Sequence, residues 1–218
     1  MPQDPRPVLQ VDIVSDVVCP WCIIGWLQLD AALARTGVLA NLRWHPFELN
    51  PDMPAEGQNL REHIMQKYGS TEAQSRQARQ RLTDLGAEFG FTFAFSDDSR
   101  MRNTFRAHQL LDWAEEQGRQ HPLKLALFDA YFTKALDVND SDVLITAAQA
   151  AGLDPNAARE VLDTGSHQAR VREKQRFWTS RGVSGVPTMV FDGRYATTGA
   201  QGTDTYVQVI TRCLEEAA

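Results

Sequence analysis

The amino-acid sequence predicts an α/β fold with the element order β-α-β, a large α-helical insertion, and then α-β-β-α. Three observations predict this order: a β-rich run that leads directly into an amphipathic helix near the start, a middle region of about a hundred residues with helical periodicity, and a hairpin signal near the end. With 218 residues, 43% hydrophobic and 23% charged, the chain is long enough for one sizeable core or two small ones.

The first part of the chain predicts a β-α-β unit. The run Val11-Asp12-Ile13-Val14 is typical of a strand, and residues 23–33 repeat apolar side chains at helical spacing. Residues 39–49 predict a second strand, which ends where Asn50-Pro51 begins a loop.

The middle region predicts helices and no strands. Thr71 and Gln74 form a candidate capping box for one helix, and Gly152 is a typical stop for the last. The predicted helices span residues 59–68, 71–89, 104–117, 122–136 and 141–151.

The last part of the chain returns to mixed structure. It predicts a helix over residues 154–182 with a break near Gly165, strands over 186–191 and 195–198, and a closing helix over 204–214. The Asp192-Gly193 pair between the two β-rich runs is a strong hairpin signal.

The tetrapeptide Cys19-Pro20-Trp21-Cys22 lies at the predicted strand-to-helix turn and indicates redox chemistry. The free N–H groups and the macrodipole at a helix start stabilise a thiolate, so Cys19 is the expected nucleophile, with a lowered pKa. Cys22, inside the first turn, can attack a mixed disulfide at Cys19 and release the substrate as a thiol, and the reverse sequence transfers a disulfide. Pro20 suits the first turn, and Trp21 is expected to shape the nearby surface.

The cysteine pair also allows three other interpretations. A zinc site usually needs four Cys or His ligands, and the chain offers only Cys213 besides the pair, so no metal is expected. A static disulfide is disfavoured because residues 1–7 contain no apolar targeting stretch, which favours a cytoplasmic, reducing location. A chance pair of buried core cysteines stays open.

Composition argues against two classes of partner. A formal net charge of -6 and the lack of a basic run argue against nucleic acid. No stretch approaches the roughly 18 uninterrupted apolar residues that indicate a transmembrane helix, so no membrane partner is expected.

Two polar residues outside the tetrapeptide, Asp16 and Asn103, are further candidates, and His108 and Cys213 have simpler structural explanations. Asp16, three residues before Cys19, is a candidate for proton transfer, although a carboxylate there also suits a helix cap or solvent. Asn103 is expected first to cap the following helix and second to line the substrate cleft. His108 is expected to be a packed or surface histidine rather than a base, and Cys213 to be a small core side chain.

These motifs together carry a family resemblance. The dithiol after the first strand, the long helical middle, and Gly185-Val186-Pro187-Thr188 before the hairpin resemble the DsbA-like branch of the thioredoxin superfamily, and more narrowly its FrnE-like cytosolic members. The resemblance covers roughly residues 10–214, and this chain lacks the extra C-terminal Cys-X-Cys pair of some FrnE-like proteins. The supporting strings are Ser15-Asp16, Phe47-Glu48-Leu49-Asn50-Pro51, Asn103-Thr104, Ala107-His108 and Gly199-Ala200-Gln201.

The resemblance implies a thioredoxin fold interrupted by a helical domain, with residues 1–58 and 154–218 as the two thioredoxin-like parts and 59–153 as the insertion. It implies thiol–disulfide oxidoreductase or isomerase activity on protein or small-molecule disulfides or dithiols. Val186-Pro187 would be a cis-proline loop that faces Cys19 and pairs with an extended substrate. No cofactor is required, and glutathione is left open as a redox partner.

The sequence leaves two other functions open. Kappa-class glutathione transferases and 2-hydroxychromene-2-carboxylate isomerases share the implied architecture, but they typically have serine where Cys19 stands, so the intact pair favours redox exchange. A non-enzymatic peptide-binding module is the other alternative. A homodimer built on exposed apolar surface of the insertion is a further expectation.

Overall fold

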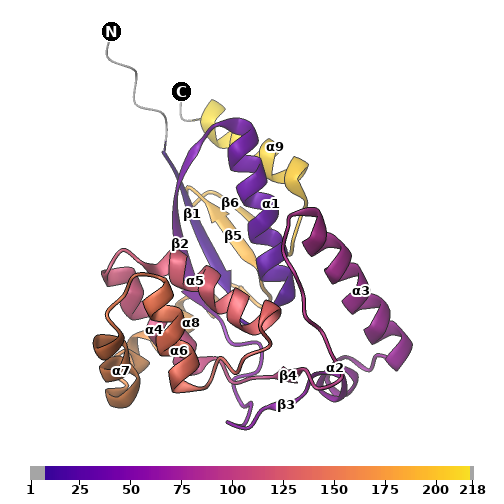
Figure 1. Ribbon diagram of the computed structural model, residues 1–218. Coiled ribbons are helices and arrows are strands. Elements are labelled where there is room, and N and C mark those ends of the chain that lie inside the picture. The colour runs from indigo at the N-terminus through magenta and orange to yellow at the C-terminus, as the bar shows by residue number, and fades with distance from the viewer. Residues whose placement is uncertain (1–7, 217–218) are drawn as a thin grey trace.

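The computed structural model describes residues 8–216, which form a central sheet covered by helices (Figure 1). The sheet has the strand order β2-β1-β5-β6, in which β1 pairs with β2 in parallel and with β5 antiparallel. β5 and β6 form the antiparallel hairpin that Asp192-Gly193 predicts. The strands are β1 (Val8–Ser15), β2 (Leu39–Pro46), β5 (Thr188–Phe191) and β6 (Tyr195–Thr198).

Two helices from opposite ends of the chain pack together beside the sheet: α1 (Pro20–Thr36) and α9 (Thr203–Glu215) (Figure 1). The helix α1 has proline at its first position, where a missing N–H costs little, and it ends at Gly37 in the left-handed conformation. Because α1 follows β1 directly, its N-terminus lies at the carboxyl end of that central strand.

Helices fill the chain between β2 and β5. Thr71 and Gln74 form the predicted capping box, and Asp140 and Asp154 accept backbone N–H bonds at two other helix starts. The helices are α2 (Leu60–Tyr68), α3 (Glu72–Glu88), α4 (Phe105–Glu116), α5 (Gln120–Phe128), α6 (Ser141–Ala150), α7 (Pro155–Thr164) and α8 (Gln168–Thr179), with a π-helical turn at Asp129–Thr133.

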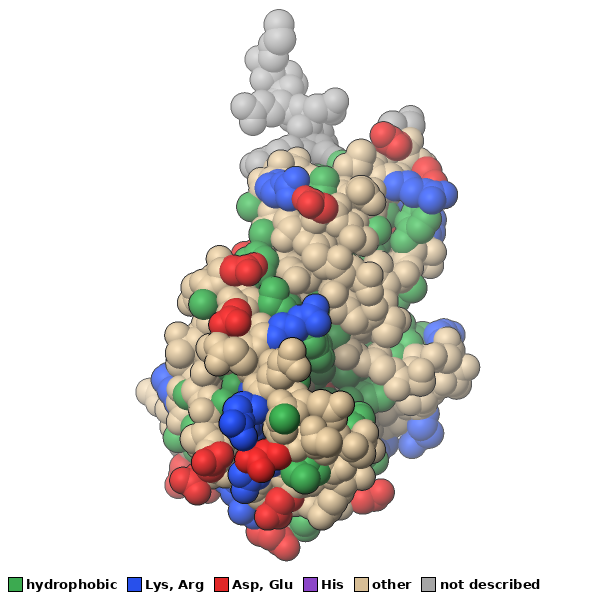
Figure 2. Space-filling view, turned by 90° about the vertical axis from the view of Figure 1, so that its right-hand side faces the viewer, with side chains coloured by type: hydrophobic (Ala, Val, Ile, Leu, Met, Phe, Trp, Pro, Cys, Tyr) green, Lys and Arg blue, Asp and Glu red, His purple; other side chains and the backbone are tan. Residues whose placement is uncertain are grey.

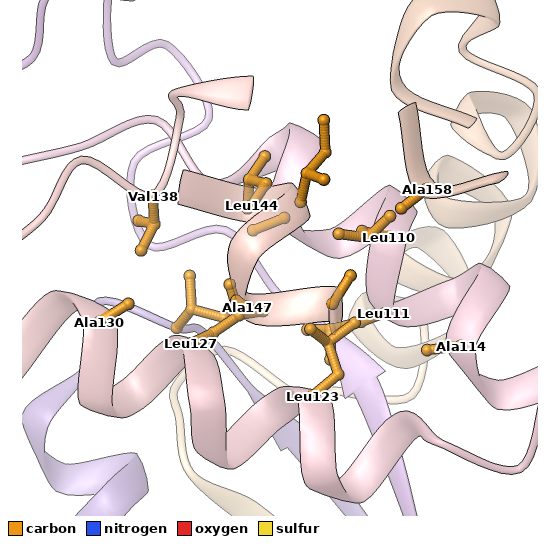
Figure 3. Close-up of a cluster of buried hydrophobic side chains, with 14 of the residues drawn as sticks. Leu110, Leu111, Ala114, Leu123, Leu127, Ala130, Val138, Leu144, Ala147 and Ala158 are labelled. Carbon is orange, nitrogen blue, oxygen red and sulfur yellow. The ribbon is translucent and has the colours of Figure 1, made fainter. Parts of the chain in front are cut away.

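The interior contains two hydrophobic clusters. One joins α4, α5, α6 and α7 through buried leucines and alanines, among them Leu110, Leu127 and Ala147 (Figure 3). The other lies against the sheet and includes both dithiol cysteines, Phe128 and Phe132. The end of α5 and the π-helical turn therefore contribute to the core of the sheet as well as to that of the helices.

The mixed α/β fold class is confirmed. The break at Gly165 is also confirmed, since α7 ends there with glycine in the left-handed conformation and α8 follows. The prediction of no strands in the middle was wrong: β3 (Gln58–Asn59) pairs antiparallel with β4 (Arg100–Met101). Strands of two residues are too short to have a recognisable alternation of side chains.

Some predicted boundaries also differ. The helix predicted over residues 122–136 ends at Phe128 and continues as the π-helical turn, and the strand predicted to end at 49 ends at Pro46. The expectation about a targeting stretch in residues 1–7 lies outside the described residues. Within the described part of the chain, no helix is long and apolar enough to cross a membrane.

The packing of the helical cluster gives a stability prediction. Leu127 is fully buried in that cluster, so Leu127→Ala should lower the free energy of unfolding by about 2–5 kcal/mol in urea titrations. Leu136→Ala is the matched control, because Leu136 is 41% exposed and its truncation should cost less than about 0.5 kcal/mol. Equal losses in the two variants would contradict the cluster as a source of stability.

Candidate functional site

The cysteine pair lies at the N-terminus of α1, as predicted. Cys19 is the N-cap residue in extended conformation, and its carbonyl accepts the N–H of Cys22 at 3.0 Å. Pro20 and Trp21 stand between them in the first turn. Both cysteines are free thiols and both are buried, Cys19 to 3% exposure and Cys22 completely.

The loop before β5 lies directly against Cys19. The Val186-Pro187 peptide bond is cis, as the resemblance implies, and the Cys19 thiol donates to the carbonyl of Val186 with an Sγ–O distance of 3.6 Å. Gly25 of α1 makes this approach feasible, because a Cβ there would lie 3.1 Å from Pro187 Cγ and 3.2 Å from Met189 Cε. The two segments, far apart in sequence, thus meet at the reactive sulfur.

The pKa values of the two thiols are shifted in opposite directions. Burial raises the pKa of Cys19 well above its ordinary value, and the hydrogen bond with Cys22 and the charge of Asp16 act in the same direction. The pKa of Cys22 is lowered: burial opposes this, but a hydrogen bond from Cys19, the charge of Lys124 and a hydrogen bond from Ser15 together outweigh burial.

The predicted lowering of the Cys19 pKa was therefore wrong for this reduced arrangement. Loss of water around Cys19 is the largest cause of the raised pKa, followed by the hydrogen bond with Cys22 and the charge of Cys22, and the Asp16 carboxylate adds a smaller contribution. Of the two thiols, Cys22 is the one whose pKa is lowered.

Asp16 lies beneath the dithiol, fully buried, and both of its carboxylate oxygens are used. Oδ2 accepts the backbone N–H of Leu49 at 2.8 Å, and Oδ1 lies 3.3 Å from His108 Nε2. His108 Nε2 is also 3.0 Å from the carbonyl of Phe47, so this nitrogen faces two acceptors and carries the proton. The pKa of Asp16 is lowered: burial raises it, but the hydrogen bonds and the charges of His108 and Lys124 prevail.

An apolar cavity of about 270 Å³ opens beside Cys19. The side of the molecule that carries α2 and α3 has a hollow with hydrophobic side chains in its depth (Figure 2). Cys19, Pro20, Trp21 and Val186 line the cavity, whereas Cys22 and Asp16 do not. The other lining residues are Val18, Leu49, Asn50, Leu60, Ile64, Tyr68, Ser75, Ala78, Arg79, Leu82, Phe95, Met101, Tyr131 and Phe132.

Two other predicted positions lie away from this cavity. Asn103 donates to the carbonyl of Met53 at 2.8 Å and accepts the N–H of Phe105, the first residue of α4, at 3.0 Å. The N-cap residue of α4 is Thr104, so the prediction of Asn103 at that position was wrong by one residue, and Asn103 is not among the residues that line the cavity. Its predicted contact with substrate stays a prediction. Cys213 is fully buried in the sheet cluster, which agrees with a core role.

Sequence reasoning missed two features of the site. Lys124 of α5 is buried near the dithiol, and the only signal in the sequence was a lone charge inside the apolar run of that helix. Nothing in the sequence indicated that α3 and the π-helical turn form a wall of the cavity, because both segments lie far from Cys19 in sequence. Within residues 8–216, no three His, Cys, Asp or Glu side chains group together in a way that could hold a metal ion.

A comparison with known protein families decides the classification. The model of the DSBA-like thioredoxin domain matches residues 10–211. The chain belongs to the DsbA-like thioredoxin family. Members of this family are thiol–disulfide oxidoreductases or related isomerases. This match confirms the predicted resemblance to DsbA-like proteins. The sheet agrees with it, because a long run of helices separates β2 from β5 in the sequence.

Solved structures resemble this DsbA-like protein along nearly its whole length. A probable DsbA oxidoreductase from Streptomyces coelicolor is 31% identical, covers 95% of this chain and 91% of its own, and has a TM-score of 0.86. A 2-hydroxychromene-2-carboxylate isomerase shares the fold at 17% identity, with 95% and 97% coverage and a TM-score of 0.72. The cytosolic disulfide reductase DsbM from Pseudomonas aeruginosa, solved with GSH, shares it at 16% identity, with 94% and 99% coverage and a TM-score of 0.62.

The Asp16 contacts give a prediction on pH. Since its pKa is lowered in the folded protein, the carboxylate contributes stability above the unfolded-state pKa near 3.8, and this contribution is lost as the pH falls through the folded-state pKa. Asp16→Asn should therefore have a lower free energy of unfolding than the wild type at pH 7, and this difference should become smaller below about pH 4.

Urea unfolding over a pH series checks this prediction. Asp30→Asn is the matched control, because Asp30 is an exposed aspartate of α1, and its stability should follow that of the wild type at every pH. If the difference in unfolding free energy between the wild type and Asp16→Asn stays constant down to the lowest pH, the lowered pKa of Asp16 in the folded protein is contradicted.

Proposed function

We propose that this protein catalyses dithiol–disulfide exchange, with Cys19 as the nucleophile and Cys22 as the resolving thiol. The observation that carries the proposal is the division between the sulfurs: Cys19 lines the cavity, and Cys22 lies behind it without contact with the cavity. A substrate disulfide in the cavity reaches Cys19 first. The family membership agrees with this type of reaction.

The first step needs a proton to leave Cys19. Cys22, the cysteine with the lowered pKa, accepts this proton in its thiolate form, and the charge moves to the Cys19 sulfur, which faces the substrate. The Cys19 thiolate then attacks one substrate sulfur and forms a mixed disulfide. The substrate S–S bond breaks, and the departing thiolate takes a proton from water.

The second step closes the internal disulfide. Cys22 gives its proton to the Asp16 carboxylate through water and attacks the Cys19 sulfur. The Cys19–Cys22 bond forms, the bond to substrate breaks, and the second substrate sulfur leaves as a thiolate. The dithiol has lost two electrons and the substrate disulfide has gained them, and the reverse order transfers a disulfide to a dithiol substrate.

The residues around Cys19 suit an extended substrate with an apolar group. Val186 brings its backbone to within 3.6 Å of the Cys19 sulfur, where an extended chain can pair with it, and Pro187 leaves the approach free of an N–H donor. Pro20 and Trp21 form the adjoining wall, and the Arg81 guanidinium lies 5.7 Å from the Trp21 ring centroid. A side chain next to the substrate disulfide would enter the apolar cavity.

Glutathione is a suitable redox partner in this proposal, and no bound cofactor is needed for the steps above. The similarity in fold to DsbM, a cytosolic reductase solved with GSH, supports this partner and a cytoplasmic location. Protein and small-molecule disulfides are both within the proposed substrate class. A second copy of the chain as partner stays a prediction.

One alternative has its own support. A 2-hydroxychromene-2-carboxylate isomerase has a similar fold, and the apolar cavity beside Cys19 also suits a small aromatic substrate. Glutathione-dependent isomerisation or conjugation without turnover of the dithiol would favour this alternative over exchange.

Single cysteine substitutions test the proposed roles. Cys19→Ser should reduce exchange with an insulin or peptide disulfide to the uncatalysed rate, because the attacking sulfur is lost. Cys22→Ser should accumulate mixed disulfides at Cys19, visible by mass spectrometry. Cys213→Ala is the control and should retain exchange, since Cys213 lies in the core of the sheet cluster.

Normal turnover by Cys19→Ser would exclude the proposed nucleophile. Binding of a peptide that is unchanged by loss of both Cys19 and Cys22, in a protein without exchange activity, would support a non-enzymatic binding module instead.

The cavity predicts a preference among substrates. Ala78 of α3 is exposed and lines the cavity, so Ala78→Phe should fill it and raise KM about tenfold, or roughly 1.4 kcal/mol, for a peptide disulfide with phenylalanine beside a cysteine. Ala73→Phe, on the same helix but outside the cavity, is the matched control. If both variants bind the peptide like the wild type, the apolar group does not occupy this cavity.

A further inference from the structure

One wall of the cavity beside Cys19 is formed by a single face of α3. The residues of this helix that line the cavity are Ser75, Ala78, Arg79 and Leu82. Their spacing of three and four positions places them on one side of the helix. Ala78 and Leu82 continue the apolar lining, whereas Ser75 and Arg79 put a hydroxyl and a guanidinium group one helical turn apart in the same wall.

Arg79 is the charged member of this lining. Among residues 8–216, no other Lys, Arg, Asp or Glu side chain lines the cavity. Arg79 is half-buried, so its guanidinium group has lost part of its hydration. A cation in such a position is stabilised by an anionic partner, and the described part of the chain supplies none: no hydrogen bond and no ion pair joins the Arg79 side chain to another residue.

The acidic residues of α3 do not compensate this charge. The residues three and four positions from Arg79 along the helix are Ser75, Arg76, Leu82 and Thr83, and none of them is acidic. Glu72 lies 3.3 Å from the guanidinium of Arg76 and 3.6 Å from that of Arg61. Asp84 accepts a hydrogen bond of 2.8 Å from Gln80. The guanidinium of Arg79 is therefore free to bind an anion in the cavity.

Ser75 provides a second and independent observation. It is only 5% exposed and lines the cavity. Within residues 8–216, its hydroxyl forms no hydrogen bond, although its backbone N–H donates to the carbonyl of Thr71 as part of the helix. A buried hydroxyl usually has a partner, because it costs free energy to bury one without. The wall thus contains an unused donor next to an unpaired cation.

A carboxylate matches these two groups. It accepts two parallel N–H bonds from a guanidinium group and further bonds from a hydroxyl, and apolar surroundings strengthen such charged hydrogen bonds. The net charge of -6 opposes the approach of anions in general, so a preference for them needs local cations. Arg81, whose guanidinium lies 5.7 Å from the ring centroid of Trp21, adds a second positive charge beside the dithiol turn.

We propose that Ser75 and Arg79 form a carboxylate-binding subsite, which gives the exchange reaction a preference for disulfides that carry a carboxylate close to the half-cystine. This inference rests on the proposed function. Cys19 and Arg79 line the same cavity of about 270 Å³, so one short substrate segment reaches both. Arg79 is a specificity-determining residue: it binds the substrate, and the bonds that break and form are those between the sulfurs.

The experiment measures KM and kcat of disulfide exchange with three peptide disulfides. Each has phenylalanine on one side of a cysteine and glutamate, glutamine or lysine on the other. The variants are Arg79→Gln, which removes the charge, Arg79→Lys, which keeps the charge without the two-pronged geometry, and Ser75→Ala. Arg76→Gln is the matched control, because Arg76 is an exposed arginine of the same helix outside the cavity.

The wild type should have the lowest KM for the glutamate peptide and the highest for the lysine peptide. In Arg79→Gln, the KM for the glutamate peptide should rise about fivefold, or roughly 1 kcal/mol, and become equal to that for the glutamine peptide. The value of kcat should stay the same, because the carboxylate is bound equally before and during the reaction. Arg79→Lys and Ser75→Ala should give smaller rises, and Arg76→Gln none.

The source of the carboxylate is distinguished by a fourth substrate, oxidised glutathione, which also carries carboxylates near its half-cystines. A rise of KM in Arg79→Gln with oxidised glutathione alone would identify a small-molecule substrate, and a rise with the glutamate peptide alone would identify a protein substrate. Either result supports the subsite. A rise with neither substrate overturns it.

The remaining outcomes are also decisive. Equal KM values of the wild type for the three peptides would overturn the subsite and leave the proposed function standing. A rise in Arg79→Gln that is the same for the glutamate and glutamine peptides would show a change of shape and not of charge, which also overturns it. Absence of exchange with every substrate would instead overturn the proposed function.

A measurement on the wild type alone keeps the inference testable if a variant fails to fold. The ratio of the KM values for the glutamine and glutamate peptides should fall toward one as the salt concentration rises, because salt screens the charge of a half-buried guanidinium group. A ratio that is above one but independent of salt would overturn the electrostatic origin of the preference.

Discussion

Removal of water from the dithiol is the physical constraint on which the rest of the site depends. Both cysteines lie at the junction of α1 with the sheet, where a thiolate loses its hydration. The protein replaces that hydration with specific partners, which for Cys22 include the hydroxyl of Ser15 and a buried cation. The balance between lost water and these partners decides which sulfur carries the charge.

Most of those partners come from helices that are distant in sequence. The helix α4 brings His108 to Asp16 across 92 positions, and α5 brings Lys124. The thioredoxin-like strands and α1 supply the two sulfurs, Asp16 and Val186, but they do not supply the groups that neutralise Asp16. The helices between β2 and β5 are thus part of the electrostatics of the site and also one wall of the cavity.

The parts of the fold and site that could be predicted are those encoded locally. The cysteine pair at a helix start, the Asp192-Gly193 hairpin and the Thr71 capping box each depend on a few neighbouring residues. The pKa direction of Cys19 could not be predicted, because it depends on burial by the whole fold. The contact of Asp16 with His108 could not be predicted either, since the sequence predicted only a packed or surface histidine and does not show which residue lies opposite it in the fold.

The π-helical turn at Asp129–Thr133 contributes side chains to both hydrophobic clusters. Ala130 points into the helical cluster, Phe132 belongs to the sheet cluster, and Tyr131 contacts both while its hydroxyl donates to the carbonyl of Arg100 at 2.9 Å. Tyr131 and Phe132 are also walls of the cavity beside Cys19. A substitution that shifts this turn would therefore change the shape of the cavity and the packing of the helical cluster together.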